Sequence, residues 1–192
     1  EGRAQTAPMY ASQVNPMLYG PFGPGVSMNE LWDLYTEQRK LSGLTHIRGN
    51  KISTGFYHIV VEVWTVFNDG TVLITQRHPS KPFPLLYECT GGSILKGEDS
   101  LHGAIRELLE ETGIRTTSEK LQKIYEYSNK DTIYDVYVNK EKSINIEDLN
   151  IPNDEVINAK IVSIQEIEKL ISSGLMIPKL KYFLELYKKN IK

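Results

Sequence analysis

The middle of the chain contains two segments with the hydrophobic pattern of paired β-strands. Residues 57–67 and 71–77 are rich in β-branched and aromatic side chains, which favour strands. Between them lies Asn68-Asp69-Gly70, which is typical of a tight turn joining antiparallel strands. The sequence therefore predicts a hairpin here, in a sheet that is at least partly antiparallel.

Shorter segments repeat the strand and helix patterns further along the chain. Strands are predicted at 123–127, 133–138 and 159–163, and helices at 101–112, 164–172 and 179–190. Pro79, Pro82 and Pro84 predict a loop after the hairpin. Strands interleaved with helices indicate an α/β sandwich with a mixed sheet.

A further helix is expected near the start of this region. From Asn29 onward, Leu31, Leu34 and Tyr35 follow helical spacing, and Gly43 is placed where a helix would end. Residues 1–27 differ from the rest, because they are rich in proline and glycine and their only charges are Glu1 and Arg3. This segment lacks the pattern of a secretory signal. We expect 1–27 to be an expression leader or an extended arm, and 28–192 to be the functional domain.

Composition narrows the range of partners. The 192 residues carry 22 basic and 24 acidic side chains, a net charge of −2, which gives no general electrostatic attraction to nucleic acid. A single cysteine excludes an internal disulfide and a zinc site made of several cysteines. The longest apolar runs fall well short of the roughly 20 residues that span a bilayer. We expect a cytoplasmic protein with no nucleic-acid or membrane partner.

The predicted helix 101–112 combines an apolar stripe with three carboxylates. The stripe consists of Leu101, Ala104, Ile105, Leu108, Leu109 and Thr112. Glu107, Glu110 and Glu111 are expected on the opposite side, where their mutual repulsion costs a few tenths of a kcal/mol, roughly, per pair. Converging carboxylate oxygens suit a hard cation such as Mg²⁺. The alternative is a solvated acidic face.

The residues before and within this helix resemble the signature of the Nudix hydrolases. Its fixed positions are Gly92, Glu98, Arg106-Glu107-Leu108, Glu110-Glu111 and Gly113-Ile114, separated by five, seven, one and one residues. The similarity reaches motif strength over 92–114 and covers about 28–180 in outline. It implies a Nudix-type α/β/α sandwich and hydrolysis of a pyrophosphate bond in a small, nucleoside-diphosphate-type substrate.

The resemblance also implies roles for particular residues. Metal ligands for Mg²⁺ or Mn²⁺ would be Glu107, Glu110, Glu111 and the carbonyl of Gly92, with Glu107 and Glu111 as the catalytic candidates. Glu98 and Arg106 would fix the helix against its loop, or form an ordinary salt bridge.

Residues outside the motif provide further candidates. Asp135 or Glu155 is a candidate for an additional acid, each with a surface or turn role as the alternative. Arg48, Arg77 and Lys81 lie at strand ends or in loops where they would meet a phosphate or remain solvated. Dimers are common among proteins similar to this family, so a homodimer is one of the assemblies we consider.

Two other functions compete with hydrolysis. The opening region is similar to the Nudix branch that contains isopentenyl diphosphate isomerase, whose catalytic cysteine would align with Gly91, two residues after Cys89. A buried thiol is the simpler interpretation of Cys89. A sensor that binds a nucleotide or metabolite without catalysis would be expected to lose a motif carboxylate, and none is lost.

Overall fold

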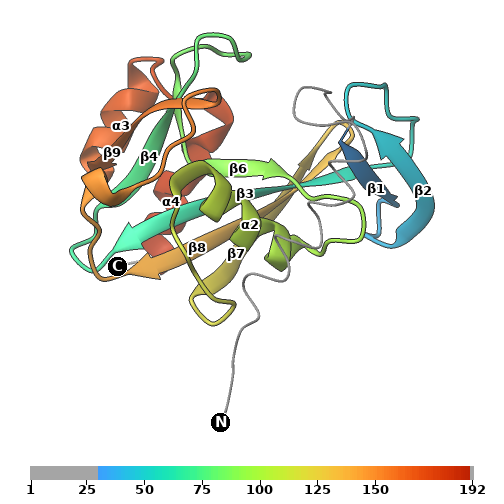
Figure 1. Ribbon diagram of the computed structural model, residues 1–192, viewed down its shortest axis with the longest axis horizontal. Helices are drawn as coiled ribbons and strands as arrows, with labels where there is room; N and C mark the ends of the chain where they lie inside the picture. The colour runs from blue at the N-terminus through green and yellow to red at the C-terminus, as the bar shows by residue number, and fades with distance from the viewer. Residues whose placement is uncertain (1–29, 191–192) are drawn as a thin grey trace.

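The structure, a computed structural model, describes residues 30–190. The strands are β1 (Leu31–Tyr35), β2 (Leu41–Ile47), β3 (His58–Phe67), β4 (Val72–Arg77), β5 (Tyr87–Glu88), β6 (Thr90–Ser93), β7 (Leu121–Asn129), β8 (Thr132–Glu141) and β9 (Val156–Val162). The α-helices are α2 (Ser100–Thr112), α3 (Ile164–Ser172) and α4 (Tyr182–Asn190), and two short 3₁₀ helices are η1 (Ile146–Asp148) and η2 (Pro178–Lys181) (Figure 1). The predictions for 1–27 concern residues outside this range.

A seven-stranded mixed sheet forms the centre of the fold. β3 pairs in parallel with β8, with Ile59 opposite Ile133, and β8 pairs antiparallel with β7. The first half of β3 pairs antiparallel with β6, whereas its end pairs with β4 at Val66 and Val72. β5 and β9 both pair with β4. The sheet therefore divides at β3 into two branches. One branch contains β6, and the other contains β4, β5 and β9.

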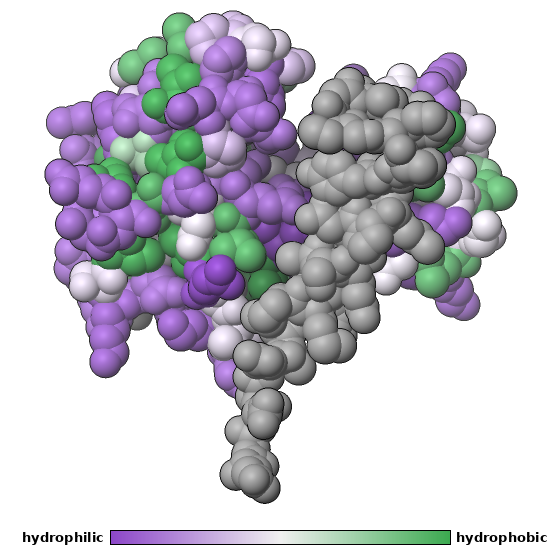
Figure 2. All heavy atoms as spheres, in the orientation of Figure 1, coloured by the Kyte–Doolittle hydropathy of each residue, from purple (hydrophilic) through white to green (hydrophobic). Residues whose placement is uncertain are grey.

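Opposite faces of β3 pack against different helices. Trp64 and Val66 belong to the core that includes Phe183 of α4, and Val61 belongs to the core that includes Leu108 of α2. The sheet thus lies between α2 on one side and α3 with α4 on the other, which confirms the predicted α/β/α sandwich (Figure 1). The face seen in Figure 2 is largely hydrophilic with small apolar areas.

The predicted hairpin is confirmed, with its turn where the sequence indicates. Asp69 accepts hydrogen bonds from the backbone and hydroxyl of Thr71 at 2.9 and 2.6 Å. Gly70 has a φ of +85°, which is the left-handed conformation that favours glycine. β7, β8 and α2 extend slightly beyond their predicted bounds, and α3 has the bounds that the sequence predicts. β9 begins three residues before the predicted strand and ends one residue earlier, and the helix predicted at 179–190 is divided into η2 and α4.

The helix predicted from Asn29 is wrong, because the described part of this segment is a strand. β1 pairs antiparallel with β2 in a separate two-stranded sheet. Trp32 and Leu34 are buried while Leu31 is exposed, so the side chains alternate with a period of two. Five residues are too few to distinguish this pattern from helical spacing. Gly43 lies inside β2, not at a helix end.

Candidate active site

The glycine-rich segment and α2 form one continuous loop–helix unit beside β3. Asp99 caps the helix by accepting a hydrogen bond from the His102 backbone at 2.8 Å, and Gly113 ends it with a φ of +76°. A Cβ on Gly103 would lie 2.5 Å from the Ile94 side chain. The absence of that Cβ lets the helix pack closely on the loop that precedes it.

Gly92 allows a carboxylate to approach the backbone of β6. In the β3–β6 pairing, Gly92 lies opposite Val61. A Cβ at this position would lie 2.3 Å from the carboxyl carbon of Glu107. The motif therefore needs glycine here for a steric reason, since any side chain would displace the carboxylate of Glu107.

Arg106 connects the acidic side chains of the motif. Its guanidinium binds Glu98 through two hydrogen bonds of 2.8 and 2.9 Å, and it reaches Glu107 at 2.9 Å and Glu110 at 3.0 Å. It also donates to the carbonyl of Ser93 at 3.1 Å. The predicted role of Arg106 and Glu98 in joining helix and loop agrees with these contacts.

The helical pattern predicts that the three glutamates share one face of α2, opposite the apolar stripe. The structure differs from this prediction. Glu107 and Glu111 are buried, and Glu110 is exposed. Glu107 and Glu111 turn toward β6, where the backbone N–H of Gly91 donates to Glu111 at 3.4 Å. The pattern misleads because the glycines of β6 leave space for carboxylates on a side that would otherwise hold apolar groups.

Burial makes the two inner carboxylates costly to ionise. It raises the pKa of Glu107 to about 7, although the neighbouring Arg106 counteracts part of the effect. Burial also raises the pKa of Glu111 well above its usual range, and the negative charge of Glu107 adds to this. Within residues 30–190, no set of acidic, histidine or cysteine side chains is already arranged as metal ligands. A nearby cation would favour the ionised form of both carboxylates.

Charged side chains on or next to β4, β5 and β9 act electrostatically on Glu111. Glu88 of β5 pairs with Arg77 at 2.8 Å, and Lys81 pairs with Glu155 at 3.1 Å. The charges of Glu88 and Glu155 raise the pKa of Glu111, and that of Lys81 lowers it. The three motif glutamates therefore lie in a region where acidic and basic groups from both branches meet.

A sequence model of the NUDIX domain matches residues 56–183, which is more than half of the chain. The chain belongs to the Nudix hydrolase family. An uncharacterized Nudix hydrolase of Listeria monocytogenes is 38% identical over 152 residues, covering 78% of this chain and 89% of that protein. This Nudix protein is thus an enzyme of the hydrolase type.

Two further likenesses extend this result. The ADP-ribose pyrophosphatase of Bacillus subtilis is 29% identical over 117 residues, covering 59% of this chain and 62% of that protein. A crystal structure from Deinococcus radiodurans has a TM-score of 0.67 at 17% identity and covers 81% of this chain and 98% of that one. The structural likeness supports the Nudix fold.

The structure brings some of the predicted candidates to the Nudix motif and places others elsewhere. Lys81 and Glu155 act electrostatically on Glu111, and Arg77 is linked to this region through its ion pair with Glu88. Asp135 is buried on β8, where Arg39 binds it through two hydrogen bonds of 2.7 Å. It makes no contact with the motif glutamates among the residues that the structure describes.

Arg48 has the solvated position that is one of its two expected alternatives, with a side chain that is 62% exposed, and Glu88 is a residue that the sequence does not single out. Arg48 lies just after the β1–β2 hairpin and pairs with Glu30 at 2.8 Å. Glu88 was missed by the sequence analysis, although an acidic residue just before the glycines of the Nudix motif was a usable signal. Its approach to Glu111 depends on pairing between β5 and β4, which the local sequence does not specify.

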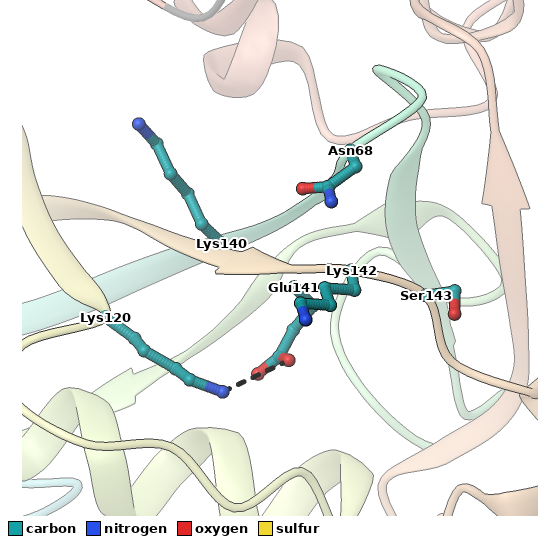
Figure 3. Close-up of a pocket in the computed structure, with 6 residues that line it drawn as sticks. All are labelled: Asn68, Lys120, Lys140, Glu141, Lys142 and Ser143. Atoms are coloured by element: carbon teal, nitrogen blue, oxygen red, sulfur yellow. Dashed lines mark hydrogen bonds and ion pairs between the residues drawn. The ribbon is translucent and has the colours of Figure 1, made fainter.

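A separate pocket lies around the end of β8 and the turn after β3. Lys120, Lys140 and Lys142 line it with Asn68, Glu141 and Ser143 (Figure 3). Lys120 pairs with Glu141 at 3.4 Å. No residue of the Nudix motif lines this pocket. In the described residues, no helix is long and apolar enough to cross a membrane.

Proposed function

We propose that this Nudix hydrolase cleaves the pyrophosphate bond of a nucleoside-diphosphate-type substrate with the help of Mg²⁺ or Mn²⁺. The observation that carries the proposal is the pair of buried carboxylates, Glu107 and Glu111, next to the backbone of Gly91 and Gly92. Such groups are unfavourable in a fold unless a cation compensates them.

The donor set fits a hard divalent cation. Glu107, Glu110 and Glu111 would hold it through carboxylate oxygens, with the carbonyl of Gly92 as a further ligand. When bound, the cation would neutralise phosphate charge and lower the pKa of a coordinated water. Glu107 is our candidate to orient the attacking water or accept its proton. Arg106 holds Glu107 and Glu110 in place through the ion pairs described above.

The substrate class is inferred from relatives and from charge. The Bacillus subtilis relative is named an ADP-ribose pyrophosphatase, so ADP-ribose is the first compound to test. Lys81 lowers the pKa of Glu111, and Arg77 pairs with Glu88, which raises it. Both cations are our candidates for binding phosphate oxygens. Of the additional acids, the surroundings of Glu111 support Glu155 and Glu88 over Asp135.

The surroundings of Cys89 support hydrolysis over the isomerase alternative. Its side chain is 3% exposed, and burial raises the pKa of the thiol well above its usual range. A catalytic cysteine needs access to substrate and is favoured by a lowered pKa. The fit of Cys89 to a catalytic role is therefore poor.

The test is release of phosphate-containing products from a panel of diphosphates. The panel contains ADP-ribose, dinucleotides, sugar nucleotides, coenzyme A and isoprenoid diphosphates, each with Mg²⁺, with Mn²⁺ and with excess EDTA. We expect turnover of at least one nucleoside diphosphate compound with metal and none with EDTA. Full turnover in EDTA, or no turnover of any compound, would contradict the proposal.

A further inference from the structure

The β1–β2 hairpin contacts the loop that joins β6 to α2, which is the loop of the Nudix motif (Figure 1). The backbone N–H of Lys96 donates to the carbonyl of Leu31 at 2.9 Å, and its ammonium donates to the hydroxyl of Thr45 at 2.7 Å. The carboxylate of Asp33 accepts a hydrogen bond of 2.7 Å from the backbone N–H of Gly97. A hairpin outside the central sheet therefore holds the motif loop at three points.

The motif loop turns at Gly97, and Glu98 closes the turn. Gly97 has a φ of +80°, the left-handed conformation that favours glycine. The backbone N–H of Glu98 donates to the carbonyl of Leu95 at 3.0 Å, and the carboxylate of Glu98 accepts from the N–H of Leu95 at 3.1 Å. The N–H of Gly97 instead donates to Asp33, outside the turn. Asp33 thus ties this turn to β1.

Glu98 connects the turn to the motif glutamates. The two hydrogen bonds from Arg106 occupy both carboxylate oxygens of Glu98, and the same guanidinium binds Glu107 at 2.9 Å. The side chains of Arg106 and Glu98 are 12% and 9% exposed, so little water is available to replace these contacts. A shift of the turn would therefore move Glu98, and with it the guanidinium that holds Glu107.

The hairpin is itself fixed to the central sheet near its turn. Arg39, between β1 and β2, donates two hydrogen bonds of 2.7 Å to Asp135, whose side chain is fully buried on β8. Arg39 has a φ of +61°, which residues other than glycine adopt at a cost. Tyr35 exchanges backbone hydrogen bonds of 2.8 and 2.9 Å with Tyr57, just before β3. Asp33 therefore acts from a support that is anchored to the core.

We propose that Asp33 is a positioning residue for the cation site, because it fixes the turn that holds Glu98 and Arg106. The inference rests on the proposed function, in which Glu107 is a ligand of Mg²⁺ or Mn²⁺. Residues that orient metal ligands typically contribute roughly 10–100-fold to metal affinity or activity. Asp33 acts through intervening residues, so its expected contribution lies at the lower end of that range.

The first test measures Mn²⁺ binding without substrate, from the electron paramagnetic resonance signal of the free ion. Asp33→Ala removes the acceptor of the Gly97 N–H and should weaken Mn²⁺ binding about tenfold. Asp33→Asn keeps an oxygen that can accept this hydrogen bond and should bind Mn²⁺ within about threefold of the wild type. The matched control is Asp69→Ala, which removes a carboxylate that binds a backbone N–H in the β3–β4 turn and should leave Mn²⁺ binding unchanged.

A second measurement separates positioning from a general loss of stability. Asp33→Ala and Asp69→Ala each lose a hydrogen bond to a backbone N–H, so both should melt at a somewhat lower temperature. Well below both melting temperatures, only Asp33→Ala should bind Mn²⁺ more weakly. In a Glu98→Ala background the link to Arg106 is already broken, and adding Asp33→Ala should weaken Mn²⁺ binding by no more than about twofold.

The outcomes distinguish this inference from the proposed function. Wild-type binding of Mn²⁺ with an unchanged affinity in Asp33→Ala would overturn the inference alone. Asp33→Asn as weak as Asp33→Ala would do the same, because the charge and not the hydrogen bond would then be responsible. A full tenfold effect in the Glu98→Ala background would also overturn it. A wild type that binds Mn²⁺ but hydrolyses no diphosphate would overturn the proposed function, and one that binds no Mn²⁺ would overturn both.

Discussion

Glu62 and Glu107 are buried next to the same pair of strands, yet their surroundings differ in kind. Glu62 has two tyrosine hydroxyls and a lysine ammonium of its own. Among residues 30–190, Glu107 is bound by Arg106 alone, and this guanidinium also binds Glu98 and Glu110. Burial raises the pKa of Glu107 to about 7. A carboxylate with a structural role is compensated within the fold.

The difference suggests what the motif carboxylates are for. Glu111 is buried with only one hydrogen bond, the long one from Gly91, within the described residues. Leaving a buried charge without a partner costs stability. We interpret the acidic pair of α2 as a site whose compensating charge comes from outside the chain, and Glu62 as a site that already contains it.

The largest expected effect comes from removing one motif charge. Glu111→Gln keeps the shape of the side chain, and we expect it to lower kcat about 100-fold or more, as loss of a positioned catalytic group does. Without metal its melting temperature should equal or slightly exceed that of the wild type, because like-charge repulsion is relieved. Steady-state kinetics and thermal melts measure both. Glu168→Gln, an exposed change on α3, is the control and should alter neither.

The apolar side of the same helix should show the reverse behaviour. Leu108 is fully buried in the core beneath α2, and Leu108→Ala should cost about 2–5 kcal/mol of unfolding free energy. Leu109→Ala, at a half-buried position on the same helix, should cost less. Denaturant unfolding measures both. If Glu111→Gln unfolded more easily than Leu108→Ala, our assignment of the two sides of α2 would be wrong.

His58 should give a smaller effect that depends on pH. Its ring stacks on Trp32 at 4.2 Å, and burial lowers its pKa from 6.5 to about 4. Between these values the unfolded chain binds a proton that the folded chain does not, so folding stability falls as pH falls from 6.5 toward 4. The upper limit is about 3 kcal/mol at 1.36 kcal/mol per unit, and solvent screening reduces it.

The measurement compares unfolding free energies of the wild type and His58→Gln across that range. The difference between the two proteins should shrink as the pH falls, because only the wild type loses this contribution. A difference that stays constant from pH 7 to pH 4 would show that His58 is not held neutral by burial.

Cys89 should give the smallest effect. Cys89→Ala removes one small buried side chain and should cost on the order of 1 kcal/mol of stability, with most of the metal-dependent hydrolysis retained. The measurement is kcat/KM together with the melting temperature. A loss of activity by about 1,000-fold at an unchanged melting temperature would assign a chemical role to Cys89 and restore the isomerase interpretation.

The sequence predicts those features that depend on neighbours in the chain. The hairpin turn at Asn68–Gly70, the cap of α2 at Gly113 and the spacing of the motif are all local, and each is found as expected. The sequence predicts a helix where β1 lies, because β1 is defined by its pairing with β2 and the spacing of its own side chains does not reveal that pairing.

Features that depend on strand pairing were not accessible from the sequence. Glu88 approaches Glu111 only because β5 and β6 lie on different branches of the sheet, and Lys179 reaches Glu62 only after η2 has packed behind β3. The burial of Glu107 follows from the pairing of Gly92 with β3. Periodicity within α2 alone therefore gave the wrong exposure for two of the three glutamates.

The central claim is that the buried glutamates of α2 are compensated by an external cation. The most direct test is the melting temperature of the wild type and of Glu111→Gln as Mg²⁺ or Mn²⁺ is added without substrate. A cation that binds only the folded protein raises its stability with concentration. We predict that the wild type is progressively stabilised and that Glu111→Gln responds little. Equal stabilisation of the two proteins, or none of the wild type, would contradict the account.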